Sequence, residues 1–200
     1  MKILAAEFIR SCAVPEQLPS GNTPEFAFVG RSNVGKSSVI NTLLQRRGLA
    51  KVSKSPGKTR AINLFDVETD SAVYPNVHFV DLPGYGYAKV SKEMRAQWAP
   101  LLERYLAGRA QLLGVVLLVE SRVLGNQDRE TIAWLTSLGH DPVLVATKID
   151  KLKPSERVGA LRRLRQHLGL PADRSLTEFS SKTGEGRDRL WQAMIARCRT

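Results

Sequence analysis

The residues most able to do chemistry lie in one short run near the N-terminus. It reads Gly30-Arg31-Ser32-Asn33-Val34-Gly35-Lys36-Ser37 and fits the pattern G-x-x-x-x-G-K-[ST]. Glycines let the backbone amides of such a loop turn inward on a phosphate chain, and a following helix N-terminus favours negative charge. We therefore expect Lys36 to reach the β and γ phosphates of a nucleotide and the Ser37 hydroxyl to bind Mg²⁺. The predicted contact segment extends to Ser38.

A second motif, Asp81-Leu82-Pro83-Gly84, follows the apolar run at 78–80. Its carboxylate is expected at the carboxyl end of a strand, where ligands of open α/β sheets bind. Asp81 would hold Mg²⁺ through a water, and the Gly84 amide would sense a γ-phosphate. A strand that ends in Asp before a Pro-Gly pair is more often only a turn. Its position one strand after the phosphate loop favours the functional interpretation.

Two later segments are expected to contact the base. In Thr147-Lys148-Ile149-Asp150, the carboxylate can accept hydrogen bonds from the N1 imino and 2-amino groups of guanine, a donor pair that adenine lacks. The Lys148 stem would cover one face of the base. In Phe179-Ser180-Ser181-Lys182, the Ser181 amide can reach the guanine O6. The order of the motifs makes guanine the predicted base.

The segment between the phosphate loop and Asp81 must supply the second hydroxyl ligand for Mg²⁺. Thr59 is the best candidate, because a flexible Pro-Gly pair precedes it, and its predicted contact segment is Gly57, Lys58, Thr59, Arg60 and Ala61. A segment ordered only when Thr59 touches the metal and the γ-phosphate would be a switch. An ordinary basic loop is the alternative. The predicted catalytic residues are thus Lys36, Thr59 and Gly84.

These motifs need a scaffold that brings strand ends together, and the chain supplies short apolar runs alternating with helical segments. Strands are predicted at 26–29, 77–80, 112–119, 142–146 and 175–180, with a looser pattern at 62–68 as a possible edge strand. Helices are predicted at 36–45, 91–106, 126–138, 154–168 and 187–197. This alternation predicts a three-layer α/β fold whose mostly parallel six-stranded sheet has one antiparallel edge strand. We expect a single domain over 1–200, with 1–22 as an extended N-terminal lead-in.

Net charge, cysteine content and the length of apolar runs exclude several classes of protein. The 30 Lys and Arg residues outnumber the 19 Asp and Glu residues and give a net charge of +11, which points to a polyanionic partner. Two cysteines without metal-ligand spacing indicate neither a disulfide framework nor a zinc site. The longest apolar run, 112–119, falls short of the roughly 20 residues that span a bilayer. We expect a cytoplasmic, soluble monomer without a membrane partner.

Basic residues gather in two places. Between 45 and 60 there are six and no acidic residue: Arg46, Arg47, Lys51, Lys54, Lys58 and Arg60. Because this segment includes the predicted switch, phosphate contacts of RNA made there would depend on the bound nucleotide. A second cluster, Arg157, Arg162, Arg163 and Arg165, lies on one predicted helix, and such faces are usually just solvated.

These motifs together resemble the EngB (YihA/YsxC) family of bacterial GTPases, within the TrmE-Era-EngA-EngB-septin-like group. The resemblance runs through residues 24–41, 53–63 and the stretch VDLPGYGYAKV at 80–90. It implies a Ras-like P-loop GTPase fold, GTP and GDP as ligands, and a switch acting on the large ribosomal subunit or its rRNA, with a link to cell division and septation. Ile149 stands where the family usually has Ala, and Thr147 where most GTPases have Asn.

The hydrolysis step has two features of its own. Tyr85 occupies the place where many GTPases carry the Gln that orients water, so slow intrinsic turnover is predicted. The resemblance also implies that Asn33 helps to hold an activating K⁺, the alternative being an Asn that only stabilises its own loop.

Two other functions stay open: a GTP-dependent adaptor for a protein in septation, and a phosphotransferase, which would need an acceptor pocket and lid that the sequence does not indicate.

Overall fold

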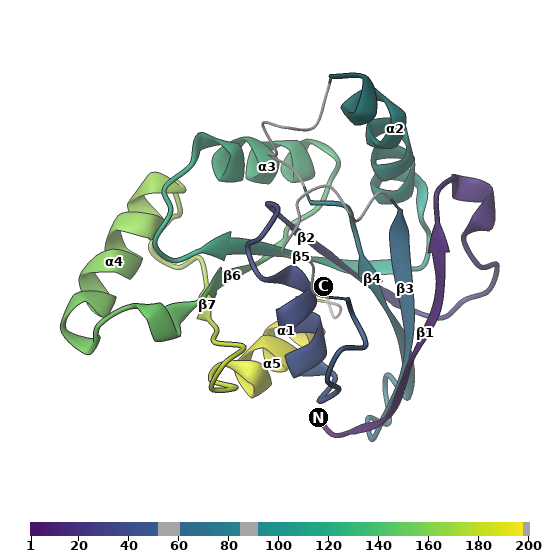
Figure 1. Cartoon of the computed structure of the whole chain (residues 1–200), viewed down its shortest axis with the longest axis horizontal. Coiled ribbons are helices and arrows are strands. Elements are labelled where there is room, and N and C mark those ends of the chain that lie inside the picture. The colour runs from purple at the N-terminus through teal and green to yellow at the C-terminus, as the bar shows by residue number, and fades with distance from the viewer. Residues whose placement is uncertain (52–60, 85–91, 198–200) are drawn as a thin grey trace.

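A seven-stranded sheet forms the centre of the protein (Figure 1). The computed structural model describes residues 1–51, 61–84 and 92–197, with the backbone alone at 15 and 92–99. The strand order is β1-β3-β4-β2-β5-β6-β7. The strands are β1 (Ile3–Cys12), β2 (Glu25–Gly30), β3 (Ile62–Thr69), β4 (Asn76–Asp81), β5 (Leu112–Glu120), β6 (Val143–Thr147) and β7 (Leu176–Glu178).

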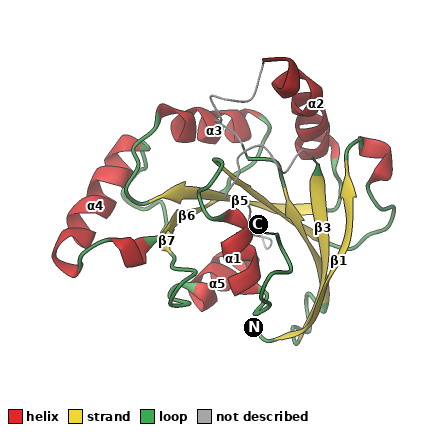
Figure 2. Ribbon diagram, viewed as in Figure 1, coloured by secondary structure: helices red, strands yellow, loops and turns green. Residues whose placement is uncertain are grey.

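Helices cover both faces of this sheet, which makes the three layers seen in Figure 2. Among the described residues the helices are α1 (Lys36–Leu43), α2 (Lys92–Gly108), α3 (Asn126–Ser137), α4 (Pro154–His167) and α5 (Arg187–Arg197), with 3-10 turns η1 (Pro15–Gln17) and η2 (Ile149–Lys151). One apolar cluster joins α1 and α5 to the sheet, and a second joins α2, α3 and α4 to the other face. The predicted α/β fold class is confirmed. No helix of the described residues is both long and apolar enough to cross a membrane.

The sheet has one strand more than the six predicted, because residues 3–12 of the expected lead-in form strand β1. It pairs antiparallel with β3 along its length, from Ile3 opposite Thr69 to Cys12 opposite Ile62. Two register shifts interrupt this pairing, and the alternation of buried and exposed side chains that identifies a strand is correspondingly broken. Strand β3, predicted at the edge, therefore lies inside the sheet and runs antiparallel to both neighbours.

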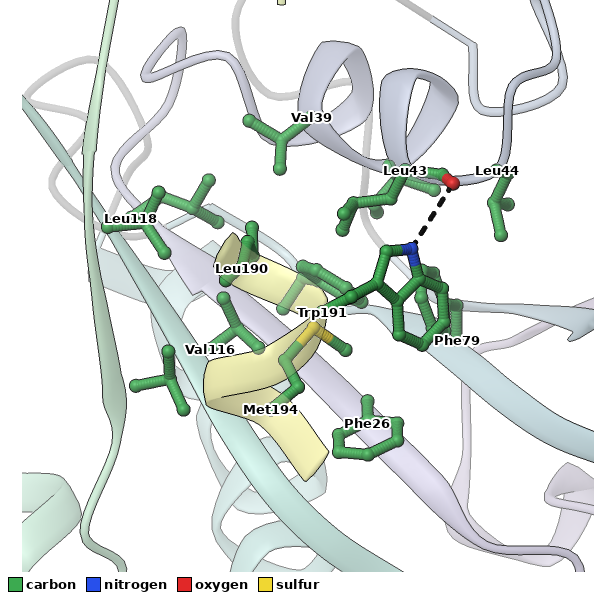
Figure 3. Close-up of a cluster of buried hydrophobic side chains, with 14 of the residues drawn as sticks. Phe26, Val39, Leu43, Leu44, Phe79, Val116, Leu118, Leu190, Trp191 and Met194 are labelled. Carbon is green, nitrogen blue, oxygen red and sulfur yellow. Dashed lines mark hydrogen bonds between the residues drawn. The ribbon is translucent and has the colours of Figure 1, made fainter. Parts of the chain in front are cut away.

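Helix α1, which begins at the phosphate loop, is fixed by a contact with α5. Figure 3 shows Trp191 of α5 reaching across the core to α1, where its indole Nε1 donates to the Leu43 carbonyl at 3.4 Å. The same ring packs on Phe79 of β4 with centroids 5.2 Å apart. One aromatic side chain thus joins α5, α1 and the sheet.

At the opposite end of the sheet a fully buried carboxylate fixes α2. Glu25, the first residue of β2, accepts hydrogen bonds from the Tyr105 hydroxyl at 2.8 Å and from Arg109 Nη2 at 2.6 Å. Burial alone would raise the pKa of Glu25, but hydrogen bonds with His78, Arg109 and Tyr105 outweigh it and hold the pKa below its usual value. The ionised form is therefore the native one.

We expect Glu25→Gln to lower the free energy of unfolding by about 3–5 kcal/mol, because it leaves the Arg109 charge without its partner. A group whose pKa is depressed in the folded state stabilises the fold above its unfolded pKa, here near 4.5, and loses that contribution as pH falls through the folded value. The wild type should therefore lose more stability than the variant below about pH 4.5. Urea unfolding measures both effects. Glu16→Gln, which removes an exposed partner of Arg104, is the control and should change neither.

Candidate nucleotide-binding site

The phosphate loop connects the buried strand β2 to helix α1, as its sequence predicts. Two residues of this loop have positive φ angles: Asn33 with φ 65° and Gly35 with φ 106°. The left-handed region is accessible to Asn and open to Gly, which explains both residue types. Lys36 and Ser37 then lie in the first turn of α1, with Lys36 buried and Ser37 half-buried.

Arg31 points to α3. Its Nε lies 3.4 Å from the Asp128 carboxylate, which is fully buried. The Arg31 side chain thus anchors the phosphate loop on α3, and its backbone remains the part available to a phosphate. Sequence reasoning did not identify Asp128 as this anchor, since the two residues are far apart in the chain.

The two motifs expected around the γ-phosphate meet directly. Lys36 Nζ and the Asp81 carboxylate form an ion pair, and both residues are less than a tenth exposed. A Cβ on Gly84 would come within 3.0 Å of the Ser32 amide nitrogen, so this close approach requires glycine. Leu82 and Pro83 between them are buried. Phosphate loop and Asp-x-x-Gly motif therefore form one surface.

The donor set at this point suits Mg²⁺. The Asp81 carboxylate and the Ser37 hydroxyl offer the oxygen ligands that this cation prefers, and Mg²⁺ commonly takes only one or two protein ligands besides phosphate and water. Thr59, the predicted third ligand, lies outside the described residues, as do Gly57, Lys58 and Arg60. Ala61 directly precedes β3 and is half-buried.

Thr147 ties the predicted base loop to the phosphate loop. Its buried hydroxyl lies 2.8 Å from the Val34 carbonyl and 3.2 Å from the Val119 carbonyl. A shorter side chain than the Asn of most GTPases thus still reaches across to the phosphate loop.

The Lys148 ammonium group is fixed by two hydrogen bonds. Its Nζ donates to the Asn33 carbonyl and to Glu120 Oε2, each at 2.7 Å. Burial raises the pKa of Glu120, but hydrogen bonding and charge from Lys148, with a smaller effect of Arg122, bring it below its usual value. The carboxylate is therefore ionised and fixes the ammonium, which leaves the Lys148 stem as a wall of the site. Glu120 is a functional candidate that sequence reasoning left without a role.

Asp150 is exposed, and its Oδ1 accepts a hydrogen bond from the buried Ser180 hydroxyl at 2.7 Å. The same Ser180 oxygen accepts from the Lys182 amide at 3.2 Å. Ile149 and Phe179, by contrast, have buried side chains in or near the core, so only their backbones can serve a ligand. Their backbones bond to each other, from the Ile149 amide to the Phe179 carbonyl at 3.3 Å.

An open pocket of about 780 Å³ lies between these base-side loops and α1, within the usual size range for small-molecule sites. Its lining includes most predicted base contacts and also a segment after α1 that was not predicted to face the base. The lining residues are Val34, Gly35, Ser38, Asn41, Thr42, Gln45, Arg46, Arg47, Gly48, Thr147, Lys148, Asp150, Lys151, Ser181, Lys182, Gly184 and Arg187.

The fold and the order of these loops along one sheet edge are those of a P-loop GTPase. A family model described as a 50S ribosome-binding GTPase matches residues 25–148. A "Probable GTP-binding protein EngB" of Desulfatibacillum aliphaticivorans is 45% identical over 99% of this chain and 94% of its own length. Another, of Clostridium perfringens (strain 13 / Type A), is 49% identical over 95% and 94%.

A crystal structure of a probable GTP-binding protein engB superposes with a TM-score of 0.69 at 24% identity, covering 88% of this chain and 98% of that one. The fold is thus shared as well as the sequence. The chain belongs to the EngB family of GTP-binding proteins and is a GTPase.

Thr147→Val should speed the release of bound GDP about fivefold, because it removes a hydrogen bond worth about 1 kcal/mol between the two halves of the site. Release of a fluorescent GDP after mixing with excess GDP measures the rate. Thr131→Val is the matched control, since its hydroxyl bonds within α3 to the Gln127 carbonyl. Equal release rates in both variants would contradict a role of Thr147 in joining the loops.

Asp150→Asn should weaken GTP binding at least about tenfold, because a carboxylate accepts from two guanine donors more strongly than an amide does. Xanthosine triphosphate should bind the variant better than it binds the wild type, since its 2-carbonyl can accept from the new amide. Titration calorimetry with both nucleotides checks this. Asp173→Asn, an exposed aspartate before β7, is the control. Unchanged preference in Asp150→Asn would remove this residue from base recognition.

Proposed function

We propose that this GTPase is a nucleotide-dependent switch that binds the large ribosomal subunit and acts in its assembly, as one domain over 1–200 and as a cytoplasmic monomer. The observation that carries the proposal is the match of residues 25–148 to a family described as 50S ribosome-binding GTPases. The net charge of +11 supports a nucleic-acid partner. The link to cell division and septation would follow from a defect in ribosome supply.

The site residues divide the work of binding and hydrolysis as follows. Amides of Gly30 to Ser38 surround the phosphates, while Asp150 and the amides of Ser181 and Lys182 hold guanine. Ser37, Thr59 and water on Asp81 would hold Mg²⁺, which neutralises charge on the β and γ phosphates when it is bound. Lys36 exchanges its ion pair with Asp81 for the phosphates, and in-line attack by water then yields GDP and phosphate.

A switch needs a sensor next to a part that can respond. Gly84 packs against Ser32 of the phosphate loop, where its amide can report a γ-phosphate. The chain continues from Gly84 through 85–91 to α2, whose C-terminal half is fixed by Glu25. A change at Gly84 would therefore be passed along the chain to α2 and from there to a bound partner.

Intrinsic hydrolysis should be slow, and K⁺ should raise it. Asn33 lies in the phosphate loop with an exposed side chain, and a cation held by that side chain would act where an arginine acts in other GTPases. The alternative explanation of Asn33 is its left-handed backbone at φ 65°. Phosphate release in K⁺ and in Na⁺ at equal ionic strength separates the two, and equal rates would leave only the backbone role.

The test of the proposed function is co-sedimentation with purified large ribosomal subunits, in GDP and in a non-hydrolysable GTP analogue, over a range of salt. We expect binding that favours the analogue and weakens steeply with salt, because phosphate contacts release counterions. Absence of binding at moderate salt, with GTP affinity intact, would instead favour the second candidate, a GTP-dependent adaptor for a protein partner.

A further inference from the structure

Four exposed basic side chains stand around the base end of the nucleotide pocket. Arg46 and Arg47 follow α1, Lys151 ends η2, and Lys182 follows β7, and all four line the pocket. We refer to these four residues as the basic rim. Among the described residues that line the pocket, Asp150 is the one that is acidic. Three distant segments of the chain therefore place positive charge at one entrance.

The charge of the basic rim is not neutralised within the described part of the chain. No described carboxylate forms an ion pair with Arg47, Lys151 or Lys182, and the contact of the Arg46 guanidinium within the described residues is one to the Leu4 carbonyl at 3.5 Å. Other basic residues are engaged: Arg109 binds Glu25, and Arg157 of α4 binds Glu178 and Glu185. Uncompensated cations on one surface attract a polyanion.

The scaffold fixes the spacing of the rim. The Asn41 side-chain amide of α1 donates to the Ala50 carbonyl and accepts from the Ala50 amide, both at 2.8 Å. These two bonds fix the C-terminal end of the loop that carries Arg46 and Arg47. The Lys151 amide bonds to the Lys148 carbonyl at 3.0 Å, and the Lys182 amide to Ser180 Oγ at 3.2 Å. Preorganised backbones lower the entropy lost when a partner binds.

We propose that the phosphate backbone of ribosomal RNA lies on the basic rim and covers the entrance of the guanine pocket. This inference rests on the proposed function and names the surface that performs it. RNA seated there blocks the route by which the nucleotide leaves, so bound RNA slows nucleotide release. If bound RNA slows release by raising the affinity for the nucleotide, then by linkage the bound nucleotide raises the affinity for RNA by the same factor.

The α4 helix, the other basic cluster, is a weaker candidate for this contact. Arg157 is paired with two glutamates, and Arg165 donates to the Pro171 and Ala172 carbonyls. Only Arg162 and Arg163 of that cluster remain exposed and without a described partner. In Figure 1, α4 lies at the β7 end of the sheet. These two arginines therefore make a matched control for the rim.

The test compares Arg47→Glu/Lys151→Glu with Arg162→Glu/Arg163→Glu, two double variants of equal charge change. Binding to large subunits and to protein-free large-subunit rRNA is measured in the GTP analogue, over a range of salt. The rim variant should lose at least about tenfold in affinity and about two in the slope of log K against log salt, while the α4 variant keeps both. The GDP affinity and the thermal midpoint of each variant are measured beside it.

A second measurement addresses the covered entrance. Release of a fluorescent non-hydrolysable GTP analogue should be several-fold slower when the wild type is saturated with subunits, and the rim variant at equal subunit concentration should show no slowing. Subunit binding that survives in the rim variant, or that leaves nucleotide release unchanged, would overturn the inference while the proposed function stands. Binding to subunits but not to protein-free rRNA would overturn it too. A wild type that binds no subunit would fail the proposed function itself.

Discussion

The parallel hydrogen-bond ladder through β4, β2, β5 and β6 is the constraint on which the site depends. Its register pairs Phe28 with Asp81, Gly30 with Leu118, and Glu120 with Thr147. Strands that run in parallel end on the same edge, so the phosphate loop, the Asp-x-x-Gly motif and the base loop have to emerge side by side. Both faces of β2 and β6 are buried, so a slip by one residue in this ladder would exchange the side chains packed under the two helix layers and disrupt both, which makes the register strongly determined.

Side chains at this edge then convert neighbouring loops into one rigid surface. Thr147 reaches the Val34 carbonyl, Lys148 reaches the Asn33 carbonyl and Glu120, and Gly84 approaches Ser32 without a side chain between them. Each hydrogen bond contributes only about 1–3 kcal/mol, but together they couple the positions of these loops. The phosphate-binding and base-binding halves therefore respond to a nucleotide as a unit.

Charged side chains in this protein serve either to stabilise the fold or to line the surface around the site. Buried charges are paired inside the fold, as in Glu25 with Arg109 and Arg31 with Asp128, because an unpaired buried charge is too costly. Several arginines of α4 and the C-terminal part are likewise engaged by carboxylates or carbonyls. Of the basic side chains that form no ion pair within the described residues, four surround the nucleotide pocket.

The amino-acid sequence by itself determined the phosphate loop, the two Asp-containing motifs and the α/β class. It also determined the predicted helices and strands, whose observed ends lie within two residues of the predicted ones. These features depend on local spacing and on apolar runs, which neighbouring residues specify together. Tertiary structure alone decided that residues 3–12 form a strand, that Arg31 turns to Asp128, that Glu120 holds Lys148 and that Arg157 binds Glu178 and Glu185. The partners in each of these contacts are separated by tens of residues and are brought together by the folded sheet, so no local pattern specifies them.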